Sequence, residues 1–184
     1  MSNEQNGITG GWSLFSAPND ADRKVLVGDV RPGQEHFAPL LVSKQEAGGF
    51  SYVFAANDAV QARQGNQPFP VLVKVYAAPG EAPVVTQMHE LGHPDHLGGY
   101  GPFQDIRSSP EADLALKEVS FDRAGIRFTP FVASAQLLSG QNYLFAGNAM
   151  SATKKTDAYP AFLTVHKPSQ GKARIASIKR AWEF

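Results

Sequence analysis

Apolar and polar side chains alternate most clearly between residues 69 and 76. Val71, Val73 and Val75 are separated by single residues, among them Lys74. A period of two residues predicts a half-buried β-strand.

A different period follows Ser109. Ser109, Pro110 and Glu111 are typical of a helix start, with a capping serine and a proline in the first turn. Apolar residues then recur three and four positions apart, as on one face of a helix; they are Ala112, Ala115, Leu116 and Val119.

A shorter helix is predicted near the start of the chain. Asn19 or Asp20 can cap it, and its apolar residues are Val25, Leu26 and Val30. Gly28 inside this stretch costs about 1 kcal/mol relative to alanine, so we expect the first helix to be the weaker one.

The chain repeats its own pattern. Four blocks recur in the same order with offsets of 88 to 91 residues: 10–15 and 98–103, 37–43 and 128–134, 45–55 and 136–146, and 69–75 and 159–165. This predicts a tandem duplication of a unit of about 90 residues. We expect domains at residues 1–88 and 98–184, joined by a junction at residues 89–97.

Within each unit, one helix is followed by four predicted strands joined by hairpins. Such an order predicts an antiparallel sheet with a helix on one face. The predicted fold class is therefore α+β.

Composition restricts the partners and the location. The 17 basic and 17 acidic residues cancel, so no basic face favours nucleic acid. No apolar run reaches the roughly 20 residues that span a membrane, and residues 1–7 lack the features of a secretory signal. The sequence has no cysteine, which excludes disulfides and thiolate ligands. We expect a cytoplasmic protein that is not an enzyme and holds no cofactor or metal.

The most informative repeated block is Gln136–Ala146, whose copy is Gln45–Ala55. Each begins with glutamine, continues through a glycine-bearing turn and ends in alternating aromatic residues. Glycine lets the main chain approach a partner closely, and the glutamine amide can preorganise the loop by hydrogen bonding. We predict that the aromatic residues pack within the strands; they are Tyr52, Phe54, Tyr143 and Phe145.

These motifs resemble the cystatin superfamily, which inhibits papain-like cysteine proteases, and the resemblance covers both halves. It implies two stefin-like domains, each an antiparallel sheet of about four strands wrapped around one α-helix. It also implies reversible, non-covalent occlusion of the protease cleft by three segments of each half. In the second half these segments are Gly98-Gly99, Gln136-Leu137-Leu138-Ser139-Gly140 and Lys167-Pro168-Ser169; in the first half they are Gly10-Gly11-Trp12, Gln45-Glu46-Ala47-Gly48-Gly49 and Ala78-Pro79-Gly80.

The two halves are not expected to inhibit equally. The loop from Gln136 to Gly140 is uncharged, whereas Glu46 places a carboxylate in its counterpart. Burying that charge without a partner costs several kcal/mol or shifts its pKa, so we predict the second domain to be the stronger inhibitor. The expected partner is a papain-like protease bound by a monomer, with a domain-swapped dimer as the alternative.

Two other hypotheses remain open. One is a non-inhibitory binding or scaffold protein with the same fold. The other is a zinc protease, because His89-Glu90-Leu91-Gly92-His93 matches the HExxH motif, with His96 as a third ligand. That motif requires a helix, and Gly92 and Pro94 disfavour one here, so we expect a linker instead.

Overall fold

The computed structural model describes residues 11–27, 36–60, 64–92, 99–119, 121, 125–138, 140–153 and 157–184. The first half contains helix α1 and a four-stranded antiparallel sheet in the order β1-β2-β3-β4. Its elements are α1 (Asp20–Val27), β1 (Phe37–Glu46), β2 (Phe50–Asp58), β3 (Pro70–Ala77) and β4 (Val84–Glu90).

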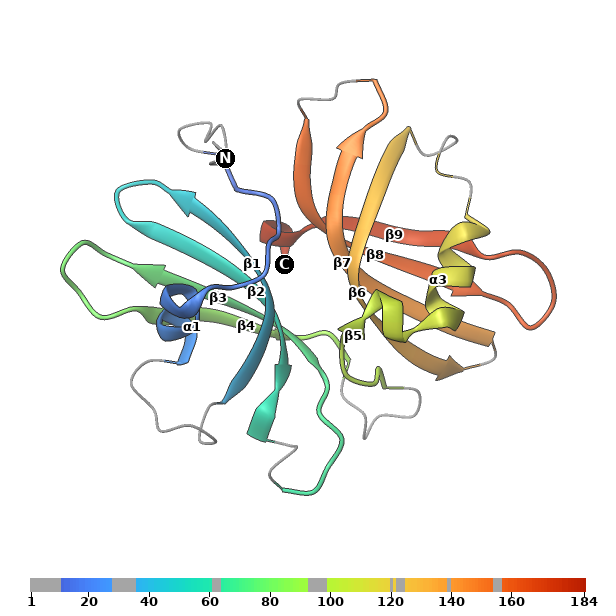
Figure 1. The fold of residues 1–184 in the computed structure, drawn as a ribbon, viewed down its shortest axis with the longest axis horizontal. Helices are drawn as coiled ribbons and strands as arrows, with labels where there is room; N and C mark the ends of the chain where they lie inside the picture. The colour runs from blue at the N-terminus through green and yellow to red at the C-terminus, as the bar shows by residue number, and fades with distance from the viewer. Residues whose placement is uncertain are drawn as a thin grey trace.

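The second half repeats this arrangement as a five-stranded sheet in the order β5-β6-β7-β8-β9. Its helices are η1 (Ile106–Ser108), α3 (Pro110–Lys117) and η2 (Ala181–Glu183), and its strands are β5 (Gln104–Asp105), β6 (Ile126–Leu138), β7 (Gly140–Ser151), β8 (Ala158–Lys167) and β9 (Arg174–Arg180). Figure 1 shows the two sheets side by side along the long axis of the molecule.

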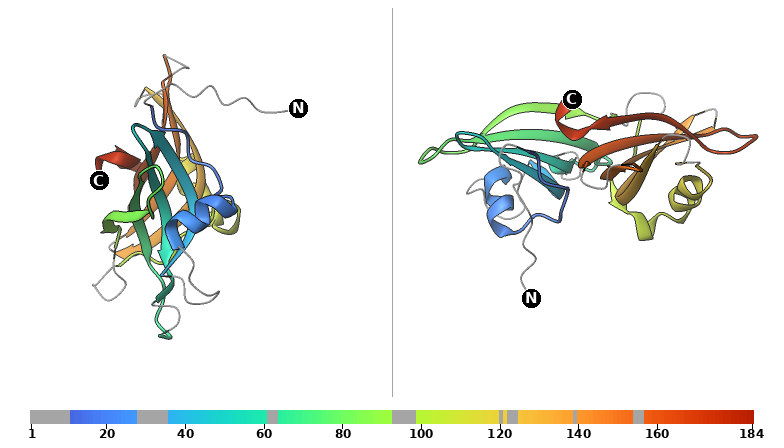
Figure 2. Two further views of the ribbon diagram at one scale, coloured as in Figure 1. Left: turned by 90° about the vertical axis from the view of Figure 1, so that its left-hand side faces the viewer. Right: turned by 90° about the horizontal axis from the view of Figure 1, so that it is seen from above.

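The prediction of two α+β domains with sheets wrapped around a helix is wrong. The described chain is mostly β, and α1 and α3 have eight residues each. A helix of that length spans about 12 Å, whereas the 13 residues of β6 span roughly 44 Å. Each helix therefore lies against one part of its own sheet and cannot fill a wrapped core; Figure 2 shows both helices on the same side of the molecule.

The strand registers repeat between the halves. In β1 the register shifts between Pro39 and Leu41, and in β6 it shifts between Pro130 and Val132. A second pair of shifts lies between β3 and β4 and between β8 and β9, also at matching positions. Since β-bulges are specific structural features, the repeat seen in the sequence is also a repeat of backbone geometry. Strand β4 continues to Glu90, into the segment predicted as a junction, and residues 93–98 lie outside the described part.

The inner faces of the two sheets form a shared core. The strands alternate as their pleat requires, so that Val53 and Leu72 of the first half meet Leu144 and Phe162 of the second in one buried cluster. The outer faces are packed separately. Leu26 of α1 packs on the first sheet, and Ala112, Ala115 and Leu116 of α3 pack on the second.

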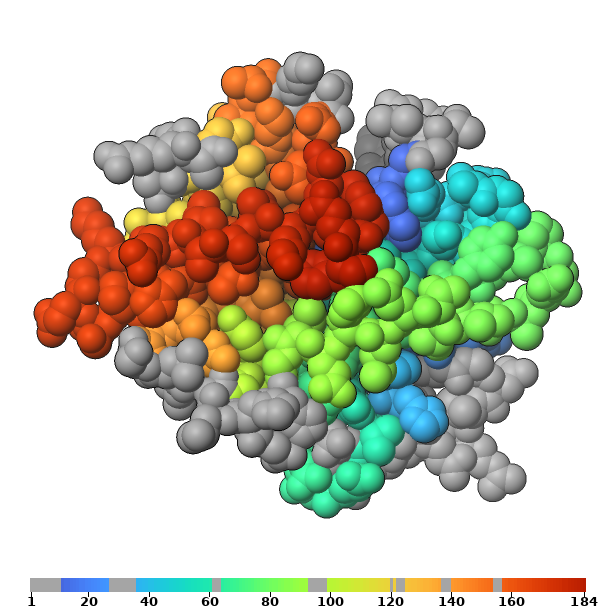
Figure 3. Space-filling view, turned by 180° about the vertical axis from the view of Figure 1, so that it is seen from behind, coloured from blue at the N-terminus to red at the C-terminus, as the bar shows by residue number. Residues whose placement is uncertain are grey.

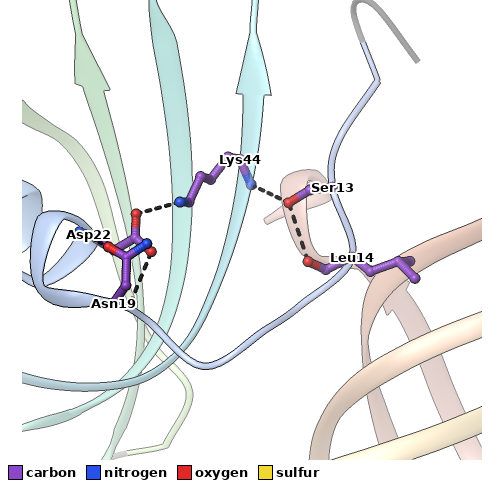
Figure 4. Close-up of polar contacts among 5 residues, drawn as sticks. All are labelled: Ser13, Leu14, Asn19, Asp22 and Lys44. Atoms are coloured by element: carbon purple, nitrogen blue, oxygen red, sulfur yellow. Dashed lines mark hydrogen bonds and ion pairs between the residues drawn. The ribbon is translucent and has the colours of Figure 1, made fainter. Parts of the chain in front are cut away.

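Helix α1 is fastened to β1 by polar contacts. Asn19 Oδ1 accepts a hydrogen bond from the Asp22 amide at 2.9 Å, and Asp22 Oδ2 accepts one from the Asn19 amide at 3.1 Å. The buried Asp22 also pairs with Lys44 Nζ at 2.5 Å, and the Lys44 amide donates to Ser13 Oγ at 2.9 Å (Figure 4). Of the two residues predicted to cap the first helix, Asn19 is therefore the one that does so, and these contacts fix the position of the helix on the sheet. The start of α3 at Pro110 is also as predicted, although Ser109 makes no side-chain capping bond.

The two halves are joined by a reciprocal pair of asparagine contacts. Asn57 Nδ2 donates to Phe103 O at 3.0 Å, and the Phe103 amide donates to Asn57 Oδ1 at 2.8 Å. In the other direction, the Phe15 amide donates to Asn148 Oδ1 at 2.8 Å, and Asn148 Nδ2 donates to Phe15 O at 3.2 Å. Matching residues thus exchange the same bonds across the interface, as in a two-fold symmetric dimer.

The C-terminal segment also crosses to the first half. Trp182 stacks on Trp12 with ring centroids 5.8 Å apart, and Ala181 is buried in the shared core. Lys74 Nζ donates to Trp182 O at 3.2 Å and to Phe184 O. Figure 3 shows this segment lying beside β4 on the back of the molecule. No helix in the described part of the chain is long and apolar enough to cross a membrane.

Replacing Asn57 or Asn148 with alanine removes both hydrogen bonds at one of the two reciprocal sites. Because the backbone groups of Phe103 or Phe15 then lose their partners, we expect each variant to lower the free energy of unfolding by about 1–3 kcal/mol, by similar amounts. Urea denaturation measures the effect, and Gln170→Ala in an exposed loop is the control. A loss confined to one of the two sites would contradict the reciprocal arrangement.

Candidate functional site

Two of the three predicted segments meet at one end of the first sheet. We call this end the first-half tip; it comprises the β1–β2 turn at residues 46–50 and the β3–β4 loop at residues 78–83. Tyr76 Oη donates to Gly48 O at 3.2 Å, and a Cβ on Gly49 would lie 2.8 Å from Ala77 O. Gln45 is half-buried opposite Ser51, and Glu46, Ala47, Gly48, Pro79 and Gly80 are exposed.

The second half has an equivalent tip at the opposite end of the molecule (Figure 1). The second-half tip comprises residues 138–141 and the β8–β9 loop at residues 168–173. A Cβ on Gly140 would lie 2.7 Å from Lys167 O and 3.2 Å from Pro168 Cα, at a φ of +111°. Glycine at this position is therefore explained by close packing of the two loops, in addition to any approach to a partner. Ser139 lies outside the described residues, as do Gly10 and Gly98, and only the backbone of Leu137 and Leu138 is described.

The third predicted segment runs beside each sheet, but its aromatic side chain faces the centre. The Ser13 amide donates to Lys44 O at 2.7 Å, and the Gly101 amide donates to Ala135 O at 3.0 Å. Trp12 stacks on Trp182, and Tyr100, its counterpart, packs against the shared core. The structure thus brings two loops together at each tip, and the exposed Gly11 and the half-buried Gly99 lie in the flanking segments.

Gln136 is held by side chains that the sequence did not single out. Its Oε1 accepts a hydrogen bond from Asn142 Nδ2 at 2.9 Å, and Asn142 Oδ1 lies 2.8 Å from His166 Nδ1. Since the Asn142 oxygen can only accept, the His166 proton lies on Nδ1. Gln136, Asn142 and His166 lie directly opposite one another on β6, β7 and β8. In the sequence, only the alternation along these strands could have indicated that the three side chains share a face.

The two tips carry opposite charge. The exposed acidic residues of the first-half tip are Glu46 and Glu81, beside the partly exposed rings of Phe50 and Tyr76. Lys172 lies in the second-half tip, and Lys167 and Arg174 flank its β8–β9 loop. Because the first-half tip is acidic and the second-half tip is basic, the two tips favour partner surfaces of different charge.

Glu118 fastens the second-half tip to the end of α3. Its Oε2 accepts a hydrogen bond from the Ala173 amide at 2.9 Å and forms an ion pair with Lys167 Nζ. The hydrogen bond from Lys167, followed by that from the Ala173 amide, lowers the pKa of Glu118 below its ordinary value.

The described part of the HExxH segment, residues 89–92, is not helical, whereas a zinc protease requires a helix there. His89 and Glu90 lie in β4, where successive side chains point to opposite faces. His89 Nε2 contacts Gln87 Nε2 at 2.6 Å, and its ring meets that of Phe184 edge-on at 6.1 Å. His93 and His96 lie outside the described residues, and the described ones contain no cluster of three metal-ligating side chains.

A groove lies between the halves, where the bulged parts of β1 and β6 face each other. Its volume is about 660 Å³, and its lining is mostly apolar, with Leu40 and Phe131 at matching positions. Asp105 and Arg107 at its rim neutralise each other through bonds that lower the pKa of Asp105 to about 2. Arg23 on α1 has no ionic partner among the described residues and gives the rim a net positive charge.

No protein-family model, curated protein or solved structure matches the chain. The resemblance to cystatins therefore stays a prediction.

Changing Glu118 to glutamine should loosen the β8–β9 loop. The variant loses the ion pair between Glu118 and Lys167, so we expect amide hydrogen exchange at Ala173 to become severalfold faster. Because the pKa of Glu118 is lower in the folded state, its stabilisation is present above the ordinary glutamate pKa and is lost as pH falls through the lowered folded value. The wild-type and variant rates should converge at that acidic end. Glu81→Gln, at the other tip, is the control and should leave Ala173 unchanged.

Proposed function

We propose that the protein is a non-enzymatic, two-ended binding protein that inhibits papain-like cysteine proteases reversibly. The observation that carries the proposal is the pairing of a hairpin turn with a second loop at each tip, at opposite ends of the molecule. A cytoplasmic location belongs to the same proposal, since a chain without cysteine suits a reducing compartment.

Two adjoining loops suit occlusion of a cleft. Gly140 packs closely against the end of β8, where an added Cβ would lie 2.7 Å from Lys167 O, and loops that are already packed together lose little entropy on binding. Glycine and other small residues let the backbone enter a cleft without displacing catalytic side chains. Such a wedge blocks substrate without supplying catalytic groups.

The second-half tip is proposed as the stronger inhibitor. Glu46 is exposed at the first-half tip and must be desolvated when that tip enters a cleft. The turn at residues 138–141 of the second-half tip carries no charged side chain, and Lys167 is already paired with Glu118 within the chain, so the turn enters a cleft without burying a charge of its own.

Inhibition is tested with the intact chain, because the halves share one core. We expect papain titration to give roughly nanomolar inhibition that a chelator does not change. The exposed Ser169 and Pro79 occupy matching positions in the β8–β9 and β3–β4 loops. Ser169→Arg should weaken inhibition at least about tenfold, whereas Pro79→Arg should change it by less than about threefold.

Equal effects of the two arginine variants would refute the ranking of the tips. Absence of inhibition at about 100 µM protein would refute the inhibitor itself and favour a binding protein without inhibitory activity. Chelator-sensitive hydrolysis would instead support a metalloenzyme.

The groove between the halves supports a second candidate function, the binding of a small organic anion. Its volume of about 660 Å³ lies within the range of small-molecule sites, which often occur between domains. The apolar floor suits a hydrocarbon or aromatic body, and Arg23 can pair with an acidic group.

The apolar anion anilinonaphthalene sulfonate is the probe for this second candidate. We expect a saturable fluorescence increase with one site per chain, weakened about threefold or more by Arg23→Gln. Lys24→Gln is the matched control, because Lys24 is exposed on the same helix and does not line the groove. No saturable signal, or equal effects of the two variants, would reject this site.

A further inference from the structure

The outermost strands β4 and β9 occupy equivalent places in the two sheets. Within the described part of the chain, each pairs with a neighbour on one side only, β4 with β3 and β9 with β8. An exposed strand edge presents unpaired backbone groups and is a template for another strand. The two edges can therefore be compared position by position, with an offset of 90 residues.

The edge at β9 is protected. Three of its seven residues are basic, namely Arg174, Lys179 and Arg180. If two copies paired antiparallel along β9, the basic side chains of one copy would lie close to those of the other and repel them. In addition, Ile175 and Ile178 pack against the core beneath α3.

The edge at β4 has neither protection. It contains no lysine, arginine or proline. Val85 and Met88, which match the two isoleucines of β9, are 46% and 47% exposed, and Val84 is 60% exposed. Figure 3 shows β4 in view beside the C-terminal segment.

The hydrogen bonds between β4 and β3 show which backbone groups of β4 point away from the sheet. The Leu91 amide donates to Pro70 O at 2.9 Å, so Leu91, His89 and Gln87 bond toward β3. Since bonding alternates along an antiparallel strand, the N–H and C=O groups of Met88 and Glu90 point to the free edge.

We propose that β4 is a self-association edge, and that two copies of this chain pair antiparallel along it with Met88 opposite Met88. The two four-stranded sheets then form one continuous sheet. In this register Gln87 lies opposite His89 and Glu90 opposite Thr86, so no like charges face each other. The net charge of zero leaves little long-range repulsion between copies. The edge is separate from both tips, so the dimer does not depend on the proposed inhibition.

The first test is the mass of the intact protein in solution, by light scattering and sedimentation equilibrium. We expect a closed dimer whose dissociation constant rises at least about tenfold in Thr86→Glu, which faces Glu90 of the other copy, and in Met88→Lys, which faces its own counterpart, because each variant brings like charges together. Ala176→Glu is the matched control, because Ala176 is the exposed counterpart of Thr86 on β9; it should leave the dimer intact. All three sites are exposed, and circular dichroism confirms folding of each variant.

A cysteine cross-link gives an independent test of the register. The chain has no cysteine, and opposed hydrogen-bonded residues lie about 5.5 Å apart between Cα atoms, within disulfide range. Met88→Cys should therefore oxidise rapidly to a covalent dimer, and Ala176→Cys should not.

Three results would overturn the proposal. These are a monomer at about 100 µM, a dimer that survives both charged variants on β4, and growth beyond two copies. Growth beyond two copies would mean that β4 pairs with β9 of the next molecule, head to tail.

Discussion

The reciprocal bonds between the two asparagines and the two phenylalanine backbones fix how the halves lie against each other. Apolar contacts between sheets are non-directional and tolerate sliding, whereas hydrogen bonds require distance and angle together. Asn57 and Asn148 each donate and accept at one residue of the other half. A shift of one sheet would break all of these bonds at once. With the backbones held, Phe15 and Phe103 place their rings against Phe162, with centroids 5.8 and 6.3 Å away.

Each half is consequently incomplete alone. A unit of about 90 residues buries a smaller share of its surface than a larger domain does, and here the inner face of each sheet is covered by the other sheet. The contacts of Trp182 with Trp12 and of Lys74 with the C-terminal carbonyls add bonds across the same boundary. The duplication is best understood as a dimer interface made permanent by a covalent connection, which keeps the two surfaces at high effective concentration.

The sequence predicted the strands and the start of α3, but it did not predict how the layers combine. Alternation around Val71–Val75 suggested one solvent-facing side, yet Leu72 is as fully buried as Val71 and Val73, because a second sheet covers it. The apolar stripe after Ser109 marked a helix face without fixing the helix length. The role of Gly140 in loop packing depends on Lys167, which is distant in sequence. Asn57 and Asn148 recur at the repeat offset of 91 residues, but a polar residue in a strand does not reveal its partner.

Fusion of the two units allows the ends of the molecule to differ. A symmetric homodimer must carry identical side chains at both tips and both edges, whereas this chain has Glu46 and Glu81 at one tip and Lys172 at the other. The same freedom applies to the outer strands. If β4 and β9 were both unprotected, each added copy would present a further free edge, and association would continue without closing. The basic residues of β9 block that route, so that an unprotected β4 can pair once, with its own copy, and the assembly closes.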